Sequence, residues 1–374
     1  MRILSVSNFF DTHGGGLERV AGHLNREFAA AGHEVAWAAS DADGLPANPA
    51  QSVALRCVNP TESLTGLPMP IPGPRSVVRL WRAVRQADAV VVHDALYVTS
   101  ILAMIFAKVA RRRTVMVQHI GAIPFANPLL NAMLKLANAL VTAPMMAAVD
   151  HLAFISATVR ADLLGSHPKR ESLLVFNGTD RSIFHDRPSA PRGEARARWA
   201  LPGDAKLAVF VGRFVEKKGL RVLRLVAEQR PEVQFALVGQ GPIDPRVWGL
   251  PNVHVLGQQP QQSIADLYRA ADVLLLPSVG EGYPLVIQEA MACGLPVICG
   301  VQSAHADPEA RRWLVGIDID LDDAVRSAAA CAAALDGPAP PRADRAAMAR
   351  YAAETYNWTR MASALLDGIA PVSR

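Results

Sequence analysis

The chain has 374 residues, of which 51% are hydrophobic and 19% are charged, and this composition is typical of a globular protein with about two domains. It excludes disordered and collagen-like chains, because apolar residues are abundant and the 26 glycines and 27 prolines follow no period. The net charge of +4 comes from the first half of the chain and favours an anionic partner there, with a solvated basic face as the alternative.

Short apolar segments alternate with helical patterns along the whole chain, which is typical of an α/β fold with mostly parallel sheets. The predicted strands of the first half lie at residues 2–8, 34–39, 89–93, 114–118 and 152–155. Those of the second half lie at residues 208–211, 234–238, 253–256, 273–276 and 296–299. Most are unbroken runs of Val, Ile, Leu and Ala, which indicates burial on both faces.

The strand pattern weakens between residues 180 and 200, where charged residues, Pro and Ser accumulate, and we interpret this segment as a linker. We therefore predict two Rossmann-like domains, at residues 1–180 and 190–357. The last helical pattern, at residues 358–374, is expected to pack back on the first domain.

The cellular setting is predicted from the amino terminus and the cysteines. The chain enters a strand pattern at once, without the basic and apolar regions of a secretory signal, and no stretch of about 20 residues is apolar enough to span a bilayer. Its four cysteines form no Cys-x-x-Cys pair, so we expect no zinc site or disulfide framework. These features predict a cytoplasmic protein.

Three glycines, Gly14, Gly15 and Gly16, follow the first predicted strand at the start of a helical pattern. Glycine lets backbone N–H groups approach a ligand closely, and the N-terminus of a helix favours an anion. The spacing is not Gly-x-Gly-x-x-Gly, so a tight structural turn explains the motif equally well.

A second motif, GRFVEKKG at residues 212–219, follows the first predicted strand of the second domain. Open α/β sheets bind ligands at the carboxyl ends of their strands. Arg213 and Lys218 could hold one diphosphate there, because arginine offers a planar fork and lysine a point charge. Two surface cations beside a helix are the alternative.

The third motif, EGYPLVIQE at residues 281–289, follows the strand pattern VLLL. A helix is predicted to begin at Pro284, a residue suited to the first helical position, with free N–H groups that suit a phosphate or a sugar hydroxyl. Glu281 and Glu289 are separated by about 12 Å along such a helix, so they could hold different parts of one ligand. A solvated helix face is the alternative.

Together these motifs resemble those of glycosyltransferase family 4, whose members are retaining enzymes with the GT-B fold. The resemblance covers nearly the whole chain, and the order and intervals of the motifs match those of the family. The segments that carry it are GGGLERV, AAGHEV, QH at a strand end, FNGTDRSIFH, GRFVEKKGL, FALVGQGP and EGYPLVIQEAMACGLPV. It implies two Rossmann-like domains facing across a cleft, and transfer of a hexose from a nucleotide-diphospho-sugar to a glycan or lipid-linked acceptor in bacterial-type surface polysaccharide or glycolipid assembly.

The resemblance also implies roles for single residues. Arg213 and Lys218 would neutralise the diphosphate, and Glu289 would hold the ribose hydroxyls. Glu281 and His119 would face the transferred sugar as the catalytic residues. The remaining donor-binding groups would be the backbones of Gly15, Gly16, Gly282, Tyr283, Pro284, Leu285 and Val286. His93 and Asp94, which also end a strand, are candidates for contact with the acceptor.

The resemblance implies no cofactor beyond the donor, and we expect no metal. The Asp-x-Asp patterns at residues 41–43 and 318–320 do not adjoin the proposed diphosphate site in sequence, so we interpret both as acidic surface loops. Many relatives carry a GG-x-PE segment after the strand at residues 296–299, whereas this chain reads GVQSAHADPE at residues 300–309. The choice between a UDP-sugar and a GDP-sugar therefore stays open.

Residues 100–149 suggest a membrane contact. In the segment 128–149, Asn131, Lys135, Asn138 and Thr142 form one polar stripe and apolar residues cover the rest. Nearby, the apolar run at residues 101–106 is followed by Lys108 and Arg111–Arg113. The excess positive charge of the first half as a whole is concentrated in Arg75, Arg79, Arg82, Arg85, Lys108, Arg111, Arg112 and Arg113. Apolar surface beside cations predicts peripheral attachment to an anionic membrane on its inner face, with core packing as the alternative.

Two other functions compete with this prediction: a nucleotide-sugar epimerase or a phosphorylase on the same fold, and a non-catalytic scaffold that binds a sugar nucleotide. The patterns expected of the competing enzymes do not accompany Glu281 and Glu289, and intact candidate residues argue against a silent scaffold. A nucleic-acid partner is not expected, because aromatic residues make up only 6% and form no stripe with basic ones.

Overall fold

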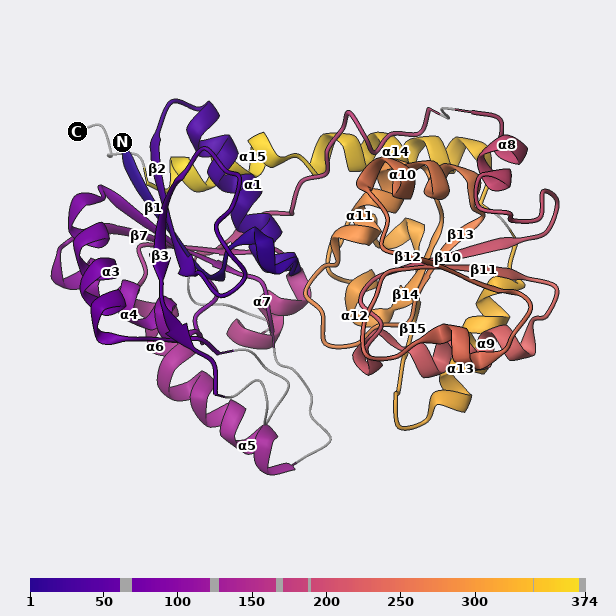
Figure 1. Cartoon of the computed structure of the whole chain (residues 1–374), viewed down its shortest axis with the longest axis horizontal. Coiled ribbons are helices and arrows are strands. Elements are labelled where there is room, and N and C mark those ends of the chain that lie inside the picture. Colours follow the sequence, from indigo (N-terminus) through magenta and orange to yellow (C-terminus); the bar gives the residue numbers. More distant parts are fainter. Residues whose placement is uncertain (61–68, 122–127, 166–170, 188–189, 339, 370–374) are drawn as a thin grey trace. The chain divides into compact units, whose positions relative to one another are not determined.

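The computed structural model describes residues 1–60, 69–121, 128–165, 171–187, 190–338 and 340–369. Its contacts divide the chain into two compact units. Unit 1 comprises Met1–Asn177 and Trp358–Arg374, and unit 2 comprises Gly178–Asn357 (Figure 1).

Unit 1 contains a seven-stranded parallel sheet in the order β3-β2-β1-β6-β7-β8-β9. Its strands are β1 (Arg2–Phe9), β2 (Glu34–Ser40), β3 (Gln51–Leu55), β6 (Ala89–His93), β7 (Arg113–Gln118), β8 (His151–Phe154) and β9 (Leu173–Leu174). A separate antiparallel pair is formed by β4 (Cys57–Val58) and β5 (Ile71–Pro72). The central strand β6 is buried along its whole length, as its unbroken apolar run predicts.

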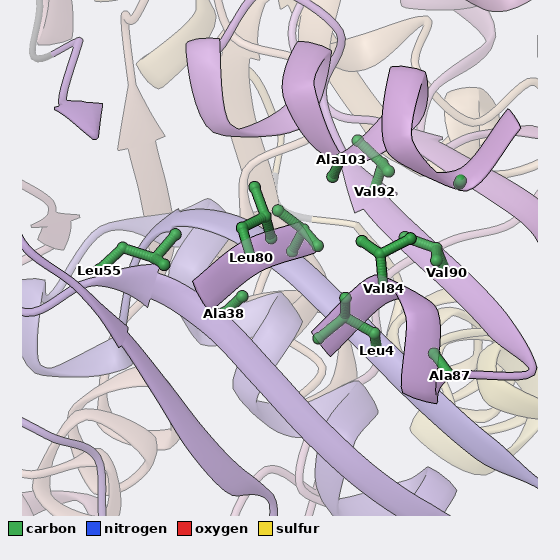
Figure 2. Close-up of a cluster of buried hydrophobic side chains, with 11 residues drawn as sticks. Leu4, Ala38, Leu55, Leu80, Val84, Ala87, Val90, Val92 and Ala103 are labelled. Carbon is green, nitrogen blue, oxygen red and sulfur yellow. The ribbon is translucent and has the colours of Figure 1, made fainter. Parts of the chain in front are cut away.

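Helices flank the sheet of unit 1. They are α1 (Gly16–Ala30), α3 (Pro74–Gln86), α4 (Val98–Val109), α5 (Pro128–Ala137), α6 (Ala143–Ala148), α7 (Ala157–Leu164) and α15 (Trp358–Asp367). Helix α3 directs Leu80 and Val84 into a core with Leu4 of β1 and Val90 of β6 (Figure 2). Burying one such side chain stabilises the fold by about 1.5–3 kcal/mol.

The chain returns to unit 1 through α15, which packs on α1. Trp358 stacks on His23 with ring centroids 4.5 Å apart, and the Thr359 hydroxyl donates a hydrogen bond of 2.7 Å to Glu27. These contacts join residues more than 330 positions apart in the sequence.

Unit 2 contains a six-stranded parallel sheet in the order β12-β11-β10-β13-β14-β15. Its strands are β10 (Leu207–Val211), β11 (Gln234–Val238), β12 (Val253–Gly257), β13 (Val273–Leu276), β14 (Val297–Gly300) and β15 (Leu314–Ile317). Its helices are α8 (Arg192–Ala197), α9 (Leu220–Gln229), α10 (Gln261–Ala270), α11 (Leu285–Ala292), α12 (Val301–Ala304), α13 (Ala324–Leu335) and α14 (Arg342–Thr355).

Both sheets have the Rossmann strand order, and the predicted α/β class with two Rossmann-like sheets is confirmed. In each sheet the order reverses beside the first strand, between β1 and β6 in unit 1 and between β10 and β13 in unit 2. The carboxyl ends of the strands at such a reversal are where doubly wound sheets bind ligands.

Candidate functional site

In unit 2, the loops that follow β10 and β13 are held together by their backbones. The Val279 N–H donates a hydrogen bond of 3.0 Å to the Lys217 carbonyl. Gly219 has a φ of +74°, and a Cβ atom there would lie 2.1 Å from the Pro277 carbonyl oxygen. Only glycine fits this approach, so the cations of the first loop are fixed beside the second loop.

A partly shielded ion pair joins the two loops. Lys218 Nζ lies 2.5 Å from Glu281 Oε1, and these side chains are 15% and 13% exposed. The Ser278 hydroxyl donates to the other carboxylate oxygen of Glu281 at 3.2 Å. The structure therefore brings together Lys218 of the second motif and Glu281 of the third.

Two further cations, Lys217 and Arg213, lie on the same loop as Lys218. Desolvation lowers the pKa of Lys217, and the charges of Lys218 and Arg213 lower it further, while Glu281 opposes them. The Arg213 side chain is exposed at the same loop. Three cations on one loop and one carboxylate on the other leave excess positive charge, which suits an anionic ligand. Sequence reasoning missed Lys217, although it lies beside Lys218.

Helix α11 starts one residue later than predicted. Pro284 is the N-cap residue and not the first helical residue, because its ψ of 130° lies outside the helical region. Proline also has no N–H group, so Pro284 cannot donate to a ligand as the predicted set of backbone groups required. Among the first helical residues, Leu285 and Val286 have N–H groups that the helix itself does not use.

The side chains of Tyr283 and Glu289 are buried. Tyr283 is 2% exposed, and its hydroxyl lies 2.8 Å from that of Tyr356. Glu289 is 8% exposed and adds to the effect of burial in raising the pKa of Tyr268. Glu289 is thus not part of a solvated helix face, which was the alternative interpretation.

In unit 1, the glycine motif is covered by a buried carboxylate. Gly15 is the N-cap residue of α1, and a Cβ atom on it would lie 2.1 Å from Glu18 Oε2. Burial raises the pKa of Glu18, which is 6% exposed. Sequence reasoning missed Glu18, although an acidic residue three positions after an N-cap is the spacing of a capping box.

Two predicted histidines are in direct contact. His93, at the end of β6, has its Nδ1 3.0 Å from Nε2 of His119, which follows β7. His93 Nε2 lies 3.4 Å from the Ser5 hydroxyl. Burial lowers the pKa of His93 to about 3, and burial together with His93 lowers the pKa of His119. Both rings are therefore neutral at pH 7.

Asp94 is held in a strained conformation beside these histidines. Its φ is +60°, and its Oδ1 accepts hydrogen bonds from the N–H groups of His119 at 2.7 Å and Ile120 at 3.2 Å. Its Oδ2 is buried and has no hydrogen-bond partner among the described residues. Burial raises the pKa of Asp94 to about 7, and Glu18 raises it too.

Tyr97 lies near both carboxyl groups. Its pKa is raised by burial first and then by the charges of Asp94 and Glu18. The structure thus gathers Asp94, Glu18 and Tyr97, of which the sequence identified only Asp94.

Basic side chains lie beside the acidic patterns 41–43 and 318–320. Asp43 lies 2.8 Å from His13, and Asp318 and Asp320 lie 3.2 Å and 3.8 Å from Arg326. Among the residues that the structure describes, no three His, Cys, Asp or Glu side chains are grouped as a metal site would require.

The segment after β7 presents apolar side chains to solvent. It comprises α5, a π-helical turn at Asn138–Thr142 and α6, and α5 projects away from the sheet of unit 1 (Figure 1). Met133, Leu136 and Leu140 are 58%, 58% and 67% exposed. We call these three residues the apolar stripe. Within the described ranges, each helix is too short or too polar to cross a membrane.

Arginines gather at another surface of unit 1. Arg75, Arg79 and Arg82 of α3 are exposed and line a pocket of about 420 Å³ with Val78. Arg79 and Arg82 also line a pocket of about 240 Å³ at the amino-terminal ends of β1, β2 and β3. This arginine surface is distinct from the carboxyl-end site, since it lies at the opposite ends of the strands.

Two family models match the chain. One, described as Glycosyltransferase Family 4, matches residues 14–182, and the other, described as Glycosyl transferases group 1, matches residues 205–335.

Curated relatives carry names of glycosyltransferases. A D-inositol 3-phosphate glycosyltransferase of Thermobispora bispora is 33% identical over 226 residues, which are 54% of this chain and 51% of the relative, so the match spans about half of that protein. A GDP-mannose-dependent alpha-(1-6)-phosphatidylinositol dimannoside mannosyltransferase of Mycobacterium tuberculosis is 27% identical over 98% of this chain and 95% of its own length.

Solved structures share the fold. A sucrose-phosphate synthase of Thermosynechococcus elongatus has a TM-score of 0.73 at 23% identity, with 98% of each chain covered. HepE of Anabaena in complex with UDP has a TM-score of 0.69 at 17% identity, with 98% of this chain and 99% of HepE covered.

Proposed function

We propose that this chain of the GT-B fold, which the Glycosyltransferase Family 4 model matches over residues 14–182 and the Glycosyl transferases group 1 model over residues 205–335, transfers a hexose from a nucleotide-diphospho-sugar to a glycan or lipid-linked acceptor with retention of configuration. One observation carries the proposal: Lys218 pairs with Glu281 where the strand order of unit 2 reverses, and Lys217 and Arg213 add positive charge on the loop of Lys218. This is the place and the charge that a diphosphate needs.

Donor binding exchanges the partners of the ion pair. Lys218 is satisfied by Glu281 in the free protein, and the diphosphate takes over Lys218 together with Arg213. Glu281 is then released to accept hydrogen bonds from hydroxyls of the transferred sugar. Glu289 accepts the two ribose hydroxyls, which a carboxylate can do at once.

The departing diphosphate is stabilised by groups of the chain itself. Arg213, Lys218 and the N–H groups of Leu285 and Val286 supply positive charge where the leaving group becomes more negative, and such electrostatic stabilisation is commonly the largest catalytic contribution. Gly15 and Gly16 contribute backbone N–H groups from unit 1. No metal is required for this step.

The acceptor hydroxyl is bound by the buried groups of unit 1. Asp94 Oδ2 has no hydrogen-bond partner among the described residues, so a substrate hydroxyl that hydrogen-bonds to it removes the cost of an unsatisfied group. His93 and His119 are neutral, and each can offer one donor and one acceptor nitrogen. His119 orients the transferred sugar, and His93 and Asp94 contact the acceptor.

The protein attaches peripherally to the inner face of an anionic membrane. The apolar stripe supports this proposal and counts against core packing, since its side chains are mostly exposed. The arginine surface of α3 adds attraction for anionic headgroups of about 1 kcal/mol per cation. A protein that stays wholly in the soluble fraction during flotation with anionic vesicles would refute the attachment.

The donor assay tests the function directly. The purified protein is incubated without acceptor with UDP-glucose, GDP-mannose or ADP-glucose. Slow hydrolysis of one donor supports the transferase, an epimerised donor supports the competing enzyme, and binding without turnover supports the scaffold. We expect the matching nucleoside diphosphate to raise the melting temperature, and Glu289→Ala to abolish most of that rise. Equal rises in both proteins would refute the ribose contact.

A further inference from the structure

Unit 2 contains a buried network of tyrosine hydroxyls around one carboxylate. Asp307 is 1% exposed, and its Oδ2 accepts hydrogen bonds from Tyr351 at 2.7 Å and Tyr356 at 2.8 Å. Tyr356 has a single hydroxyl hydrogen, which Asp307 accepts, so Tyr283 is the donor in the 2.8 Å bond between the hydroxyls of Tyr283 and Tyr356. The network therefore runs from Tyr283 through Tyr356 to Asp307.

One end of this network lies in the proposed donor loop. Tyr283 is two residues after Glu281 and directly before the N-cap of α11. Its ring is buried and packs edge-on against that of Tyr356, with centroids 5.8 Å apart. Fixing Tyr283 thus limits the backbone positions available to residues 281–284.

The middle residue of the network, Tyr356, lies where the chain passes between the units. The Tyr356 carbonyl accepts hydrogen bonds from the N–H of Thr179 at 3.0 Å and its hydroxyl at 3.4 Å. The chain passes from unit 1 to unit 2 after Asn177 and returns after Asn357. We call the two places where the chain changes unit the crossings. The backbone of Tyr356 lies directly before the second crossing and is hydrogen-bonded to Thr179 just after the first, while its side chain contacts Tyr283 of the donor loop.

We propose that Tyr356 is a positioning residue that holds the Glu281 loop in its donor-binding conformation and links that loop to both crossings. The assignment of a donor to this loop rests on the proposed function. Tyr351 offers a matched comparison, since it also donates to Asp307 but makes no hydrogen bond to Tyr283 among those that the described residues show.

The test compares Tyr356→Phe with Tyr351→Phe in the full chain. Each variant removes one hydroxyl bonded to Asp307, but only Tyr356→Phe also removes the hydrogen bond between the hydroxyls of Tyr283 and Tyr356. We expect amide hydrogen exchange of residues 279–285 to be at least about fivefold faster in Tyr356→Phe and unchanged in Tyr351→Phe. We also expect about tenfold weaker binding of UDP or GDP in Tyr356→Phe, and less than twofold weaker binding in Tyr351→Phe.

A double variant separates positioning from general stability. If Tyr356 acts through Tyr283, Tyr283→Phe weakens nucleotide binding as Tyr356→Phe does, and combining them adds little, since they remove the same bond. Equal exchange in both single variants, or additive losses in the double variant, would overturn the inference. A wild-type protein that binds none of UDP, GDP and ADP would refute the proposed function, whereas the exchange rates report on the link itself.

Discussion

The two sheets place opposite chemistry at the same topological position. Where the order of unit 2 reverses, Arg213 and Lys218 lie with Glu281 in a charged and partly accessible group. At the equivalent place in unit 1, His93 and Asp94 are fully buried, and burial favours their uncharged forms. The same sheet framework thus carries charged loops in unit 2, which suit a diphosphate, and buried neutral groups in unit 1, which suit hydroxyls.

The largest effect is expected from removing charge in unit 2. Arg213→Ala should lower kcat/KM for donor turnover about a hundredfold to a thousandfold, because it removes a cation from the departing diphosphate. Initial rates of nucleoside diphosphate release measure this. Arg246→Ala is the control, since Arg246 is an exposed arginine of unit 2 that pairs with Asp244. A similar loss in both variants would mean that Arg213 has no specific role in donor turnover.

The neutral character of unit 1 predicts a pH dependence of stability. The pKa of Asp94 is raised from 3.8 to about 7, so the folded state binds its proton more tightly than the unfolded state. This contribution to stability is fully present below pH 3.8 and is lost as the pH rises through about 7. Each tenfold difference in proton affinity between the two states corresponds to about 1.4 kcal/mol. Asp94→Asn keeps the Oδ1 acceptor but cannot ionise.

The free energy of unfolding of Asp94→Asn relative to wild type should therefore increase by roughly 3 kcal/mol between pH 4 and pH 7. Urea unfolding at each pH measures it, with Asp88→Asn, an exposed aspartate near the start of the same strand, as the control. If the free energies of unfolding of wild type and Asp94→Asn changed in parallel with pH, Asp94 would be charged in the folded protein at pH 7. Unit 1 would then not have the neutral character contrasted here with unit 2.

A smaller effect is expected at the glycine motif of unit 1. In Gly15→Ala the new methyl group would meet the Glu18 carboxylate at 2.1 Å, so that side chain must move. We expect a loss of about 1–3 kcal/mol of stability. Gly16→Ala is the matched control, because a Cβ atom there has no neighbour within 4 Å. Equal stability of both variants would mean that Glu18 moves aside without cost.

The smallest effect concerns the apolar stripe, on which the proposed membrane attachment of unit 1 depends. Leu136→Ser combined with Leu140→Ser should weaken binding to anionic vesicles about tenfold, with little change in stability, because both side chains are exposed. Co-sedimentation measures the binding. Val247→Ser, at an 80% exposed position of unit 2, is the control and should bind as wild type does.

The central strands of both sheets could be predicted from the sequence, because their apolar runs are buried on both faces. Strand β3 was missed because its residues are mostly half-exposed, β9 because it has only two residues, and β15 because two of its four residues are exposed. Helix α11 was placed one residue early, since proline suits both the N-cap observed here and the first helical position.

Part of the candidate site could also be predicted from the sequence. Arg213 and Glu281 follow β10 and β13, which are neighbours in the sheet, so strand order alone places them at one edge. The contacts of Glu18 with Gly15 and of Tyr356 with Tyr283 were not predicted. The first depends on how a side chain folds back over a helix start, and the second joins residues 73 positions apart.

The apolar stripe gives the protein an exposed thioether, whereas three of its thiols are protected. Met133 is 58% exposed, and burial raises the pKa of Cys293, Cys299 and Cys331 to about 12, which keeps their thiols protonated and unreactive. Oxidation of Met133 would turn an apolar side chain into a polar sulfoxide, a change that reductases reverse. Oxidative stress would therefore act on the surface proposed to face lipid and leave these thiols intact.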